Sequence, residues 1–434
     1  MKNVLILTYY WPPTGGAGVH RWLKFVKYLR RFGWEPIVYT PENPESPLLD
    51  PSLENDIPEG LTILKTRIWE PYALYKKFVG HSPGEGFQAG FLSEQEVPKG
   101  KQGFSVWIRG NFFIPDARKY WIKPSVKYLT AFLKKVPVKV VVTTGPPHSL
   151  HLIGLKLKQK LNIPWVADFR DPWTGIDFYP RLKLTRAADR KHHRLEQQVI
   201  RQADAVITVS HGMKKDFRKY CQNGIHVITN GYDPEDIPSV PVEPAGDFLI
   251  THLGSVNADR NPHAFWQAVS EITRENETFK KQLRIRLIGK TDVTVRTSIH
   301  EHGLKNTVEL IPPVPHEQVF TLLQQSRLLL LPVNRTPNAS SILTGKLFEY
   351  LATGRPILGI GPEDGEMARI LEENEAGQMC HWDRPDRIKS FLEQLFEKYL
   401  AGQVPAGSVN TGKYSRVELT RKLAEILDQT VDLS

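Results

Sequence analysis

The chain has 434 residues, 40% of them apolar, and a formal net charge of +10. No stretch approaches the ~20 consecutive apolar residues of a membrane-spanning helix, and the two cysteines, Cys221 and Cys380, are too few and too far apart for a disulfide framework or a metal site. This composition predicts a cytoplasmic protein of about two or three domains. The positive charge indicates anionic partners such as nucleotides, phospholipid headgroups or nucleic acid.

A glycine-rich loop follows the first apolar run of the chain. The run at 4–7 leads into the loop at 14–18, and a helical pattern begins at Val19. Gly15 and Gly16 let a ligand approach the backbone there, and the start of a helix favours anions. A dinucleotide-binding loop would also require an acidic residue at the end of the second strand, where this chain has only Val, Tyr and Thr. The loop therefore predicts a phosphate-bearing ligand other than NAD.

Apolar runs of strand length alternate with helical patterns, which is typical of parallel sheets built from βαβ units. The series restarts after a proline-rich segment at 233–244, which indicates a linker. We predict an α/β fold of two Rossmann-like, doubly wound domains that face a central cleft with the carboxyl ends of their strands, where open α/β sheets bind ligands. The expected strands are 3–8, 36–40, 61–66, 139–144, 164–169, 205–210 and 226–229, then 248–254, 284–288, 308–311, 327–332, 356–360 and 377–380.

The expected domains are residues 1–240 and 245–414, with a last helix at 415–434 that packs back toward the first domain. An irregular insertion at about 43–118 mixes Pro and Gly with Trp, Tyr and Phe beside Arg and Lys. Such a mixture suits a surface helix at a lipid interface. A packed insertion that covers the first sheet is the alternative that we favour.

The most specific segment runs from Gly345 to Gly359. We expect a helix to begin at Thr344 or Gly345, with Lys346 and Glu349 on one of its faces. Open backbone N–H groups and an ammonium suit a diphosphate, and a carboxylate one turn further on can accept both hydroxyls of a ribose. The alternative is an ordinary exposed ion pair, which contributes only tenths of a kcal/mol.

The pattern Lys-Leu-Phe-Glu-Tyr-Leu-Ala-x-Gly-x-Pro-Ile at 346–357 resembles the retaining glycosyltransferases of family GT4, which have the GT-B fold. The segments at 9–13, 14–18, 168–173 and 230–233 are similar to that family as well. The resemblance implies transfer of a sugar from a nucleotide-diphosphate sugar to a hydroxyl acceptor with retention of anomeric configuration. It implies no metal or other cofactor. The first domain would hold the acceptor and the second the donor.

The resemblance also implies site residues. Glu349 corresponds to the glutamate that holds the donor ribose, whereas the family's other glutamate falls at Ser341. The arginine expected beside Gly254 is absent, and Arg260 remains as the phosphate contact. The full donor set is Gly15, Gly16, Arg260, Thr344, Gly345, Lys346, Leu347 and Glu349, and Lys346 is also counted as catalytic because it stabilises the leaving diphosphate.

Six further residues follow strand ends of the first domain or lie at the crossing between domains. His148 is expected to act as a catalytic imidazole near the donor sugar; the alternative is that it caps its helix. Asp168 is expected to orient or deprotonate an acceptor hydroxyl, with Arg170 and Asp171 on the acceptor side; the alternative is that Arg170 neutralises its neighbours. Tyr232 and Asp233 either line the nucleotide pocket or form a hinge.

We expect a glycan or lipid-linked acceptor, used in polysaccharide or cell-envelope synthesis at the inner face of the cytoplasmic membrane. No nucleic-acid recognition module is recognisable, so nucleic acid is not an expected partner. A non-catalytic nucleotide-sugar-binding protein with the same scaffold is the main alternative function. A sugar-nucleotide epimerase or a phosphorylase would share the two-domain layout.

Overall fold

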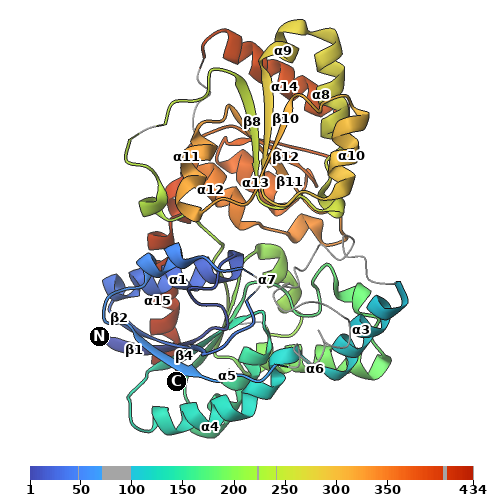
Figure 1. The fold of residues 1–434 in the computed structure, drawn as a ribbon. Coiled ribbons are helices and arrows are strands. Elements are labelled where there is room, and N and C mark those ends of the chain that lie inside the picture. The colour runs from blue at the N-terminus through green and yellow to red at the C-terminus, as the bar shows by residue number, and fades with distance from the viewer. Residues whose placement is uncertain (47, 71–98, 222–223, 241, 404–407, 434) are drawn as a thin grey trace. The chain divides into compact units, whose positions relative to one another are not determined.

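The computed structural model describes residues 1–46, 48–70, 99–221, 224–240, 242–403 and 408–433. The chain forms two compact units (Figure 1). The first unit holds the described residues up to Thr229 together with those from Arg416 on, and the second unit is Asn230–Ser415. Among the described residues, no helix combines the length and the apolarity needed to cross a membrane.

The first unit is built on a seven-stranded parallel sheet in the order β3-β2-β1-β4-β5-β6-β7. Successive residues of β1 point to opposite faces, and both faces are buried: Leu5 and Leu7 join one apolar core, Val4 and Ile6 the other. Burial on both faces explains the continuous apolar runs in the sequence. The strands are β1 (Lys2–Leu7), β2 (Trp34–Pro41), β3 (Thr62–Thr66), β4 (Val140–Gly145), β5 (Trp165–Phe169), β6 (Ala205–Thr208) and β7 (Ile225–Val227).

Helices cover both faces of this sheet, and the last helix of the chain is one of them. Leu419 and Leu423 of α15 lie in the same apolar core as Trp22 of α1, and Figure 1 shows the red α15 beside the blue α1. The helices are α1 (Ala17–Leu29), α3 (Lys99–Phe112), α4 (Ile122–Leu133), α5 (Ser149–Leu161), α6 (Arg186–Gln202), α7 (His211–Phe217) and α15 (Arg416–Asp432).

The insertion expected to be irregular is in part packed and in part exposed. Trp121 is buried and stacks on Tyr39 of β2, with ring centroids 4.9 Å apart. Trp69, Phe112 and Tyr120 are instead exposed. Helix α3 lies within this insertion, for which a surface helix was one of the two interpretations, and 71–98 lie outside the described residues.

The second unit is built on a six-stranded parallel sheet in the order β10-β9-β8-β11-β12-β13. Leu328 and Leu330 of β11 enter one apolar core, and Leu329 and Leu331 enter the other, so this sheet too is buried on both faces. The strands are β8 (Phe248–Leu253), β9 (Leu283–Ile288), β10 (Val308–Ile311), β11 (Leu328–Pro332), β12 (Ile357–Ile360) and β13 (Gly377–Cys380). Every expected strand of both units is therefore present.

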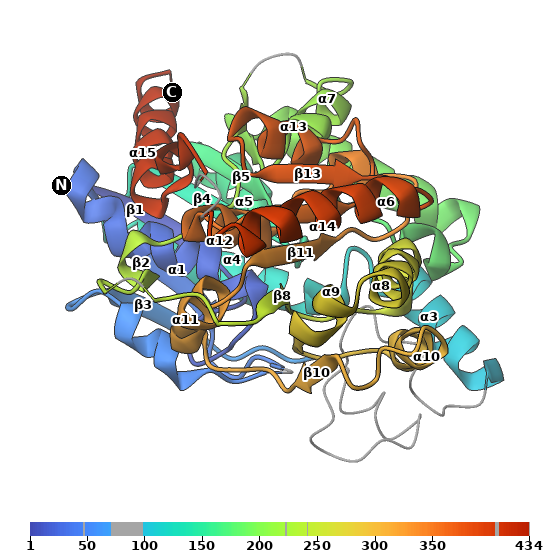
Figure 2. The same cartoon turned by 90° about the horizontal axis from the view of Figure 1, so that it is seen from above.

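The helices of the second unit fall into two groups. Helices α8 and α14 lie side by side (Figure 2) and contribute to one core, while α11, α12 and α13 contribute to the other. Their bounds are α8 (His263–Glu275), α9 (Glu277–Gln282), α10 (Val293–Glu301), α11 (Val319–Gln324), α12 (Gly345–Thr353), α13 (Glu366–Glu373) and α14 (Pro385–Leu400).

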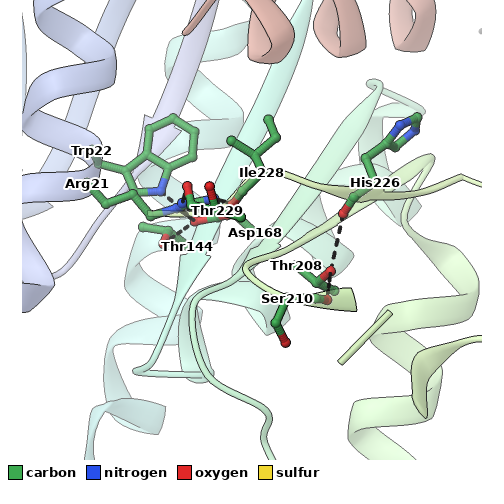
Figure 3. A network of polar contacts seen from close by, with 9 residues as sticks. All are labelled: Arg21, Trp22, Thr144, Asp168, Thr208, Ser210, His226, Ile228 and Thr229. Atoms are coloured by element: carbon green, nitrogen blue, oxygen red, sulfur yellow. Dashed lines mark hydrogen bonds and ion pairs between the residues drawn. The ribbon is translucent and has the colours of Figure 1, made fainter. Parts of the chain in front are cut away.

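A buried ion pair joins the first helix of the first unit to the carboxyl ends of its central strands (Figure 3). Asp168 is fully buried near the carboxyl end of β5 and accepts hydrogen bonds from Arg21 (2.9 Å) and Trp22 (2.7 Å) of α1. It accepts a further bond from the hydroxyl of Thr144 on β4 (2.8 Å). These donors hold the pKa of Asp168 below its ordinary value in spite of burial, which acts the other way.

The same arginine also holds the segment that follows β7. Its guanidinium donates to the carbonyls of Ile228 (2.9 Å) and Thr229 (2.8 Å). Arg21 is 1% exposed, and a buried charge of this kind is tolerated only when it is paired and hydrogen-bonded. The Arg21–Asp168 pair therefore fixes α1, β4, β5 and the end of β7 relative to one another.

Asp168→Asn should destabilise the first unit strongly, because it leaves the Arg21 guanidinium buried without its carboxylate. We expect a loss of about 3 kcal/mol in the free energy of unfolding, measured by urea denaturation. Asp428→Asn is the matched control, since it removes the exposed Lys2–Asp428 pair and should leave the stability close to that of the wild type. Equal losses in the two variants would contradict the assignment.

Candidate functional site

The side chain of Lys346 lies against the loop that follows β8. Gly254, in this loop, has a φ of +102°, and a Cβ built on it would collide with Cε and Nζ of Lys346. A side chain at position 254 would therefore displace the amine and would also strain the backbone. The glycine is what allows the amine to approach the carboxyl end of β8.

Hydrogen bonds fix this loop to the helix that carries Lys346. The backbone N–H of Gly254 donates to the carbonyl of Ile288 at the end of β9 (2.6 Å). The N–H of Leu253 donates to the hydroxyl of Tyr350 (2.7 Å), a buried residue one turn beyond Lys346 on α12. The position of the amine is thus set by two strand ends and one helix.

Arg260 is the second cation of this site. Its Nε donates to the side-chain oxygen of Asn334 (2.9 Å), and its Nη1 donates to the carbonyl of Ser255 (3.0 Å). Burial, together with the positive charge of Arg260, lowers the pKa of Lys346 to about 7, while the carboxylate of Glu349 acts in the opposite direction. An anion placed beside Lys346 would favour its charged form and raise this pKa again.

The start of α12 carries a polar group beside these cations that has no hydrogen-bond partner among the described residues. Thr344 precedes the helix without capping it, and among the described residues its buried hydroxyl oxygen has no hydrogen-bond partner. A Cβ built on Gly345 would meet no atom within 4 Å, so the first turn is sterically accessible. The first N–H groups of a helix have no partner within it and attract anions. Thr344, Gly345, Lys346 and Arg260 together make an anion-binding arrangement.

Two other residues of the expected donor set lie differently. Glu349 is partly exposed, three residues after Lys346 on α12. Leu347 is fully buried in the apolar core of the second unit, so its side chain supports the helix. Ser341, in the position of the family's other glutamate, ends a short 3-10 helix at Ala339–Ser341.

His252 on β8 was missed by the sequence analysis. It is buried, and its Nδ1 lies 2.8 Å from the carbonyl of Leu330, to which it must donate a proton. Burial, with Lys346 and Arg260 nearby, lowers its pKa well below the ordinary value, so the ring is neutral. A histidine within an apolar strand was the available signal, and its nearness to Lys346 required the fold.

The glycine-rich loop of the first unit offers one open glycine rather than two. The N–H of Gly15 donates to the carbonyl of Leu48 (2.9 Å), and a Cβ at Gly15 would lie 3.0 Å from that of Asp50. Gly16 has a φ of +92° and precedes α1, and a Cβ there would meet nothing within 4 Å. Only the backbone of Gly16 is sterically accessible to a ligand.

His148 lies in an aromatic pocket at the end of β4. Its ring stacks on Trp173 with centroids 4.8 Å apart and an interplanar angle of 4°. Its Nδ1 is buried and has no hydrogen-bond partner among the described residues. Burial, aided by neighbouring His151 and Arg170, lowers the pKa of His148 well below the ordinary value. The ring is therefore neutral.

Arg170 joins the glycine-rich loop to the turn after β4. Its guanidinium donates to the carbonyls of Gly18 (2.6 Å) and Pro146. A Cβ on Gly18 would lie 3.0 Å from this guanidinium, so glycine is needed at that position for the contact. Asp171, next in the chain, is exposed.

Tyr232 and Asp233 take part in the packing of the second unit. The ring of Tyr232 joins an apolar core of that unit, and its N–H donates to the carbonyl of Tyr414 (3.2 Å). Asp233 is buried and accepts a hydrogen bond from the N–H of Glu235 (3.1 Å), capping a 3-10 turn. Their expected roles at the nucleotide or as a hinge stay predictions.

The structure brings the candidate residues together in two sets. One set surrounds the start of α12 in the second unit, and the other lies at the carboxyl ends of β1, β4 and β5 in the first unit. That the two sets share one cleft stays a prediction, as does the absence of a metal from the reaction. Within the described ranges, no three His, Cys, Asp or Glu side chains gather so as to hold a metal ion.

Two family models match this chain. The model described as Glycosyltransferase Family 4 matches residues 85–236, and the one described as Glycosyl transferases group 1 matches residues 233–403. No curated protein matches the sequence.

Solved structures resemble the whole chain at low sequence identity. Sucrose-phosphate synthase from Thermosynechococcus elongatus has 13% identity and a TM-score of 0.59, with 100% of this chain and 98% of that chain covered. WaaG, a glycosyltransferase involved in lipopolysaccharide biosynthesis, has 14% identity and a TM-score of 0.56, with 99% of each chain covered. S. aureus TarM in complex with UDP, Fondaparinux and α-GlcNAc-glycerol has 10% identity and a TM-score of 0.57, with 100% and 98% covered. At these identities the likeness shows a shared fold.

Proposed function

From the premise that this chain belongs to the glycosyltransferases, we propose that it moves a sugar from a nucleotide-diphosphate sugar to a hydroxyl acceptor with retention of anomeric configuration. The two family models together match residues 85–403, which is more than half of the chain. The observation that carries the proposed donor class is the cluster of Lys346, Arg260 and the hydroxyl of Thr344, which has no hydrogen-bond partner among the described residues, at the start of α12.

In this proposal the second unit stabilises the leaving diphosphate. Negative charge grows on the diphosphate as the bond to the anomeric carbon breaks, and donors already in position lower the barrier. The ammonium of Lys346, the guanidinium of Arg260 and the first N–H groups of α12 supply such donors. Because the pKa of Lys346 is about 7, arrival of the diphosphate also draws a proton onto the amine. Glu349 would accept the two ribose hydroxyls from the same face of the helix.

In the first unit we propose different roles for His148 and Asp168. The neutral ring of His148 would form a hydrogen bond with a hydroxyl of the donor sugar. Its buried Nδ1 has no hydrogen-bond partner among the described residues. Asp168 already accepts hydrogen bonds from Arg21, Trp22 and Thr144. We therefore assign it a positioning role in place of the general base that the sequence suggested.

We further propose a lipid-linked or glycan acceptor met at the inner face of the cytoplasmic membrane. Trp69 and Tyr120 are exposed and pack edge to face, with ring centroids 4.9 Å apart. The ammonium of Lys119 lies 5.0 Å from the centroid of Tyr120, and Phe112 is exposed as well. Aromatic rings beside a cation suit the boundary between lipid headgroups and acyl chains.

Lys346→Ala should lower kcat by about 10²- to 10³-fold, because it removes a charge that stabilises the leaving group. The donor is first chosen by thermal shift among UDP, GDP, ADP and TDP and their sugars, since a bound donor raises Tm. Sugar transfer is then measured, with the anomeric proton of the product read by NMR to test retention. Lys280→Ala, which removes an exposed lysine on α9, is the control. Equal rates for Lys346→Ala and the control would refute the donor site.

The double variant Trp69→Ser and Tyr120→Ser should weaken binding to vesicles of phosphatidylglycerol and phosphatidylcholine by about tenfold or more, because it removes apolar area from the proposed lipid contact. Co-sedimentation measures the binding. Leu400→Ser, which removes an exposed apolar side chain on α14 of the second unit, should bind as the wild type does. Unchanged vesicle binding by the double variant would rule out this surface as the membrane contact.

A further inference from the structure

The first unit contains a pocket that has no part in the proposed transfer. It has a volume of about 360 Å³, is open to solvent, and lies between α7, β7 and α15. Its basic lining is Lys214 from α7 and Lys422 from α15, together with His211 and His226. Helix α15 lies far from α7 and β7 in the sequence and meets them only because the last helix returns to the first unit.

The charge of this pocket is positive. Glu425 is the acidic residue of the lining, but Arg421 on the same helix forms an ion pair with it. Within the part of the chain that the structure describes, neither Lys214 nor Lys422 forms an ion pair. Two lysines without an ion-pair partner among the described residues therefore line one pocket, and a bound anion would supply the missing opposite charge.

The positive charge of Lys214 also acts on the imidazole of His226. Its side chain is half-buried, and Figure 3 shows the ring turned away from the Asp168 network, while its carbonyl accepts a hydrogen bond from Thr208 (3.3 Å). Burial, and after it the charge of Lys214, lowers the pKa of His226 below the ordinary value. An anion bound in the pocket would reverse part of this effect.

The size and the walls of the pocket restrict the ligand. A volume of 360 Å³ lies at the lower end of the range for small-molecule sites. The apolar part of the lining is formed by Val227, Ile228 and Ile426, and Gln429 contributes an amide. Ile228 also accepts a hydrogen bond from Arg21 through its carbonyl (2.9 Å), so the pocket adjoins the buried ion pair that organises this unit.

We propose that this pocket is a binding site for a phosphate group, held between Lys214 and Lys422 with His226 and His211 as further donors. A soluble phosphorylated metabolite and a phospholipid headgroup share this chemistry. The proposal does not depend on the donor site in the second unit, because every lining residue belongs to the first.

The test uses the full chain labelled with ¹³C-histidine, with the NMR signal of His226 assigned through His226→Gln. Inorganic pyrophosphate and short-chain dihexanoyl phosphatidic acid, kept below its micelle concentration, are titrated separately. A bound phosphate should raise the measured pKa of His226 by about one pH unit, because it favours the imidazolium. Tighter binding of pyrophosphate indicates a soluble ligand, and tighter binding of phosphatidic acid indicates a lipid headgroup.

Variants of the lining lysines test whether the probe binds in this pocket. Lys214→Gln and Lys422→Gln should each weaken binding of the better probe about tenfold, the effect of losing one charge-assisted hydrogen bond. Lys215→Gln is the control, because Lys215 is exposed on the same helix but does not line the pocket. The proposal is overturned if neither probe moves the His226 signal, or if Lys215→Gln weakens binding as much as the two lining variants do. Failure of Lys346→Ala to affect sugar transfer would leave this result unchanged.

Discussion

The contact between the Lys346 amine and the backbone at Gly254 is the constraint on which the account of function depends. Burial and a second cation nearby disfavour the charged form of the Lys346 amine, and they lower its pKa to about 7. Tyr350 and Asn334 nevertheless hold the loop and Arg260 in place. An anion beside these two cations would offset that effect on the amine. We propose that this anion is the diphosphate of a nucleotide sugar.

The two units differ in how completely their buried polar groups are hydrogen-bonded. In the first unit the carboxylate of Asp168 is matched by Arg21 and by two neutral donors, so the charge is satisfied and holds the scaffold together. In the second unit the hydroxyl of Thr344 is left without a described partner beside Lys346. Satisfied polar groups stabilise a fold, whereas an unsatisfied one beside two cations is consistent with a ligand that supplies the missing partner.

Much of the fold could be predicted from the sequence, because the central strands of both sheets are buried on both faces and read as apolar runs, whereas the edge strands β3 and β10 are more exposed. The shared face of Lys346 and Glu349 likewise follows from helical periodicity. The rest depends on contacts between residues far apart in the chain. The partner of Asp168 is Arg21, which the sequence shows only as a charge within an amphipathic helix. The N–H of Gly15 donates to the carbonyl of Leu48, and the closeness of Lys346 to Gly254, where a Cβ would collide with the amine, is visible only in the folded chain.

Proton uptake on binding tests the central claim most directly. The nucleoside diphosphate that stabilises the protein most is titrated calorimetrically at pH 8 in two buffers of different ionisation enthalpy. At this pH the free protein holds Lys346 mostly neutral, since its pKa is about 7. A diphosphate beside the amine raises that pKa, so the account predicts uptake of close to one proton, abolished in Lys346→Met. Binding without proton uptake, or with equal uptake in Lys346→Met, would contradict it.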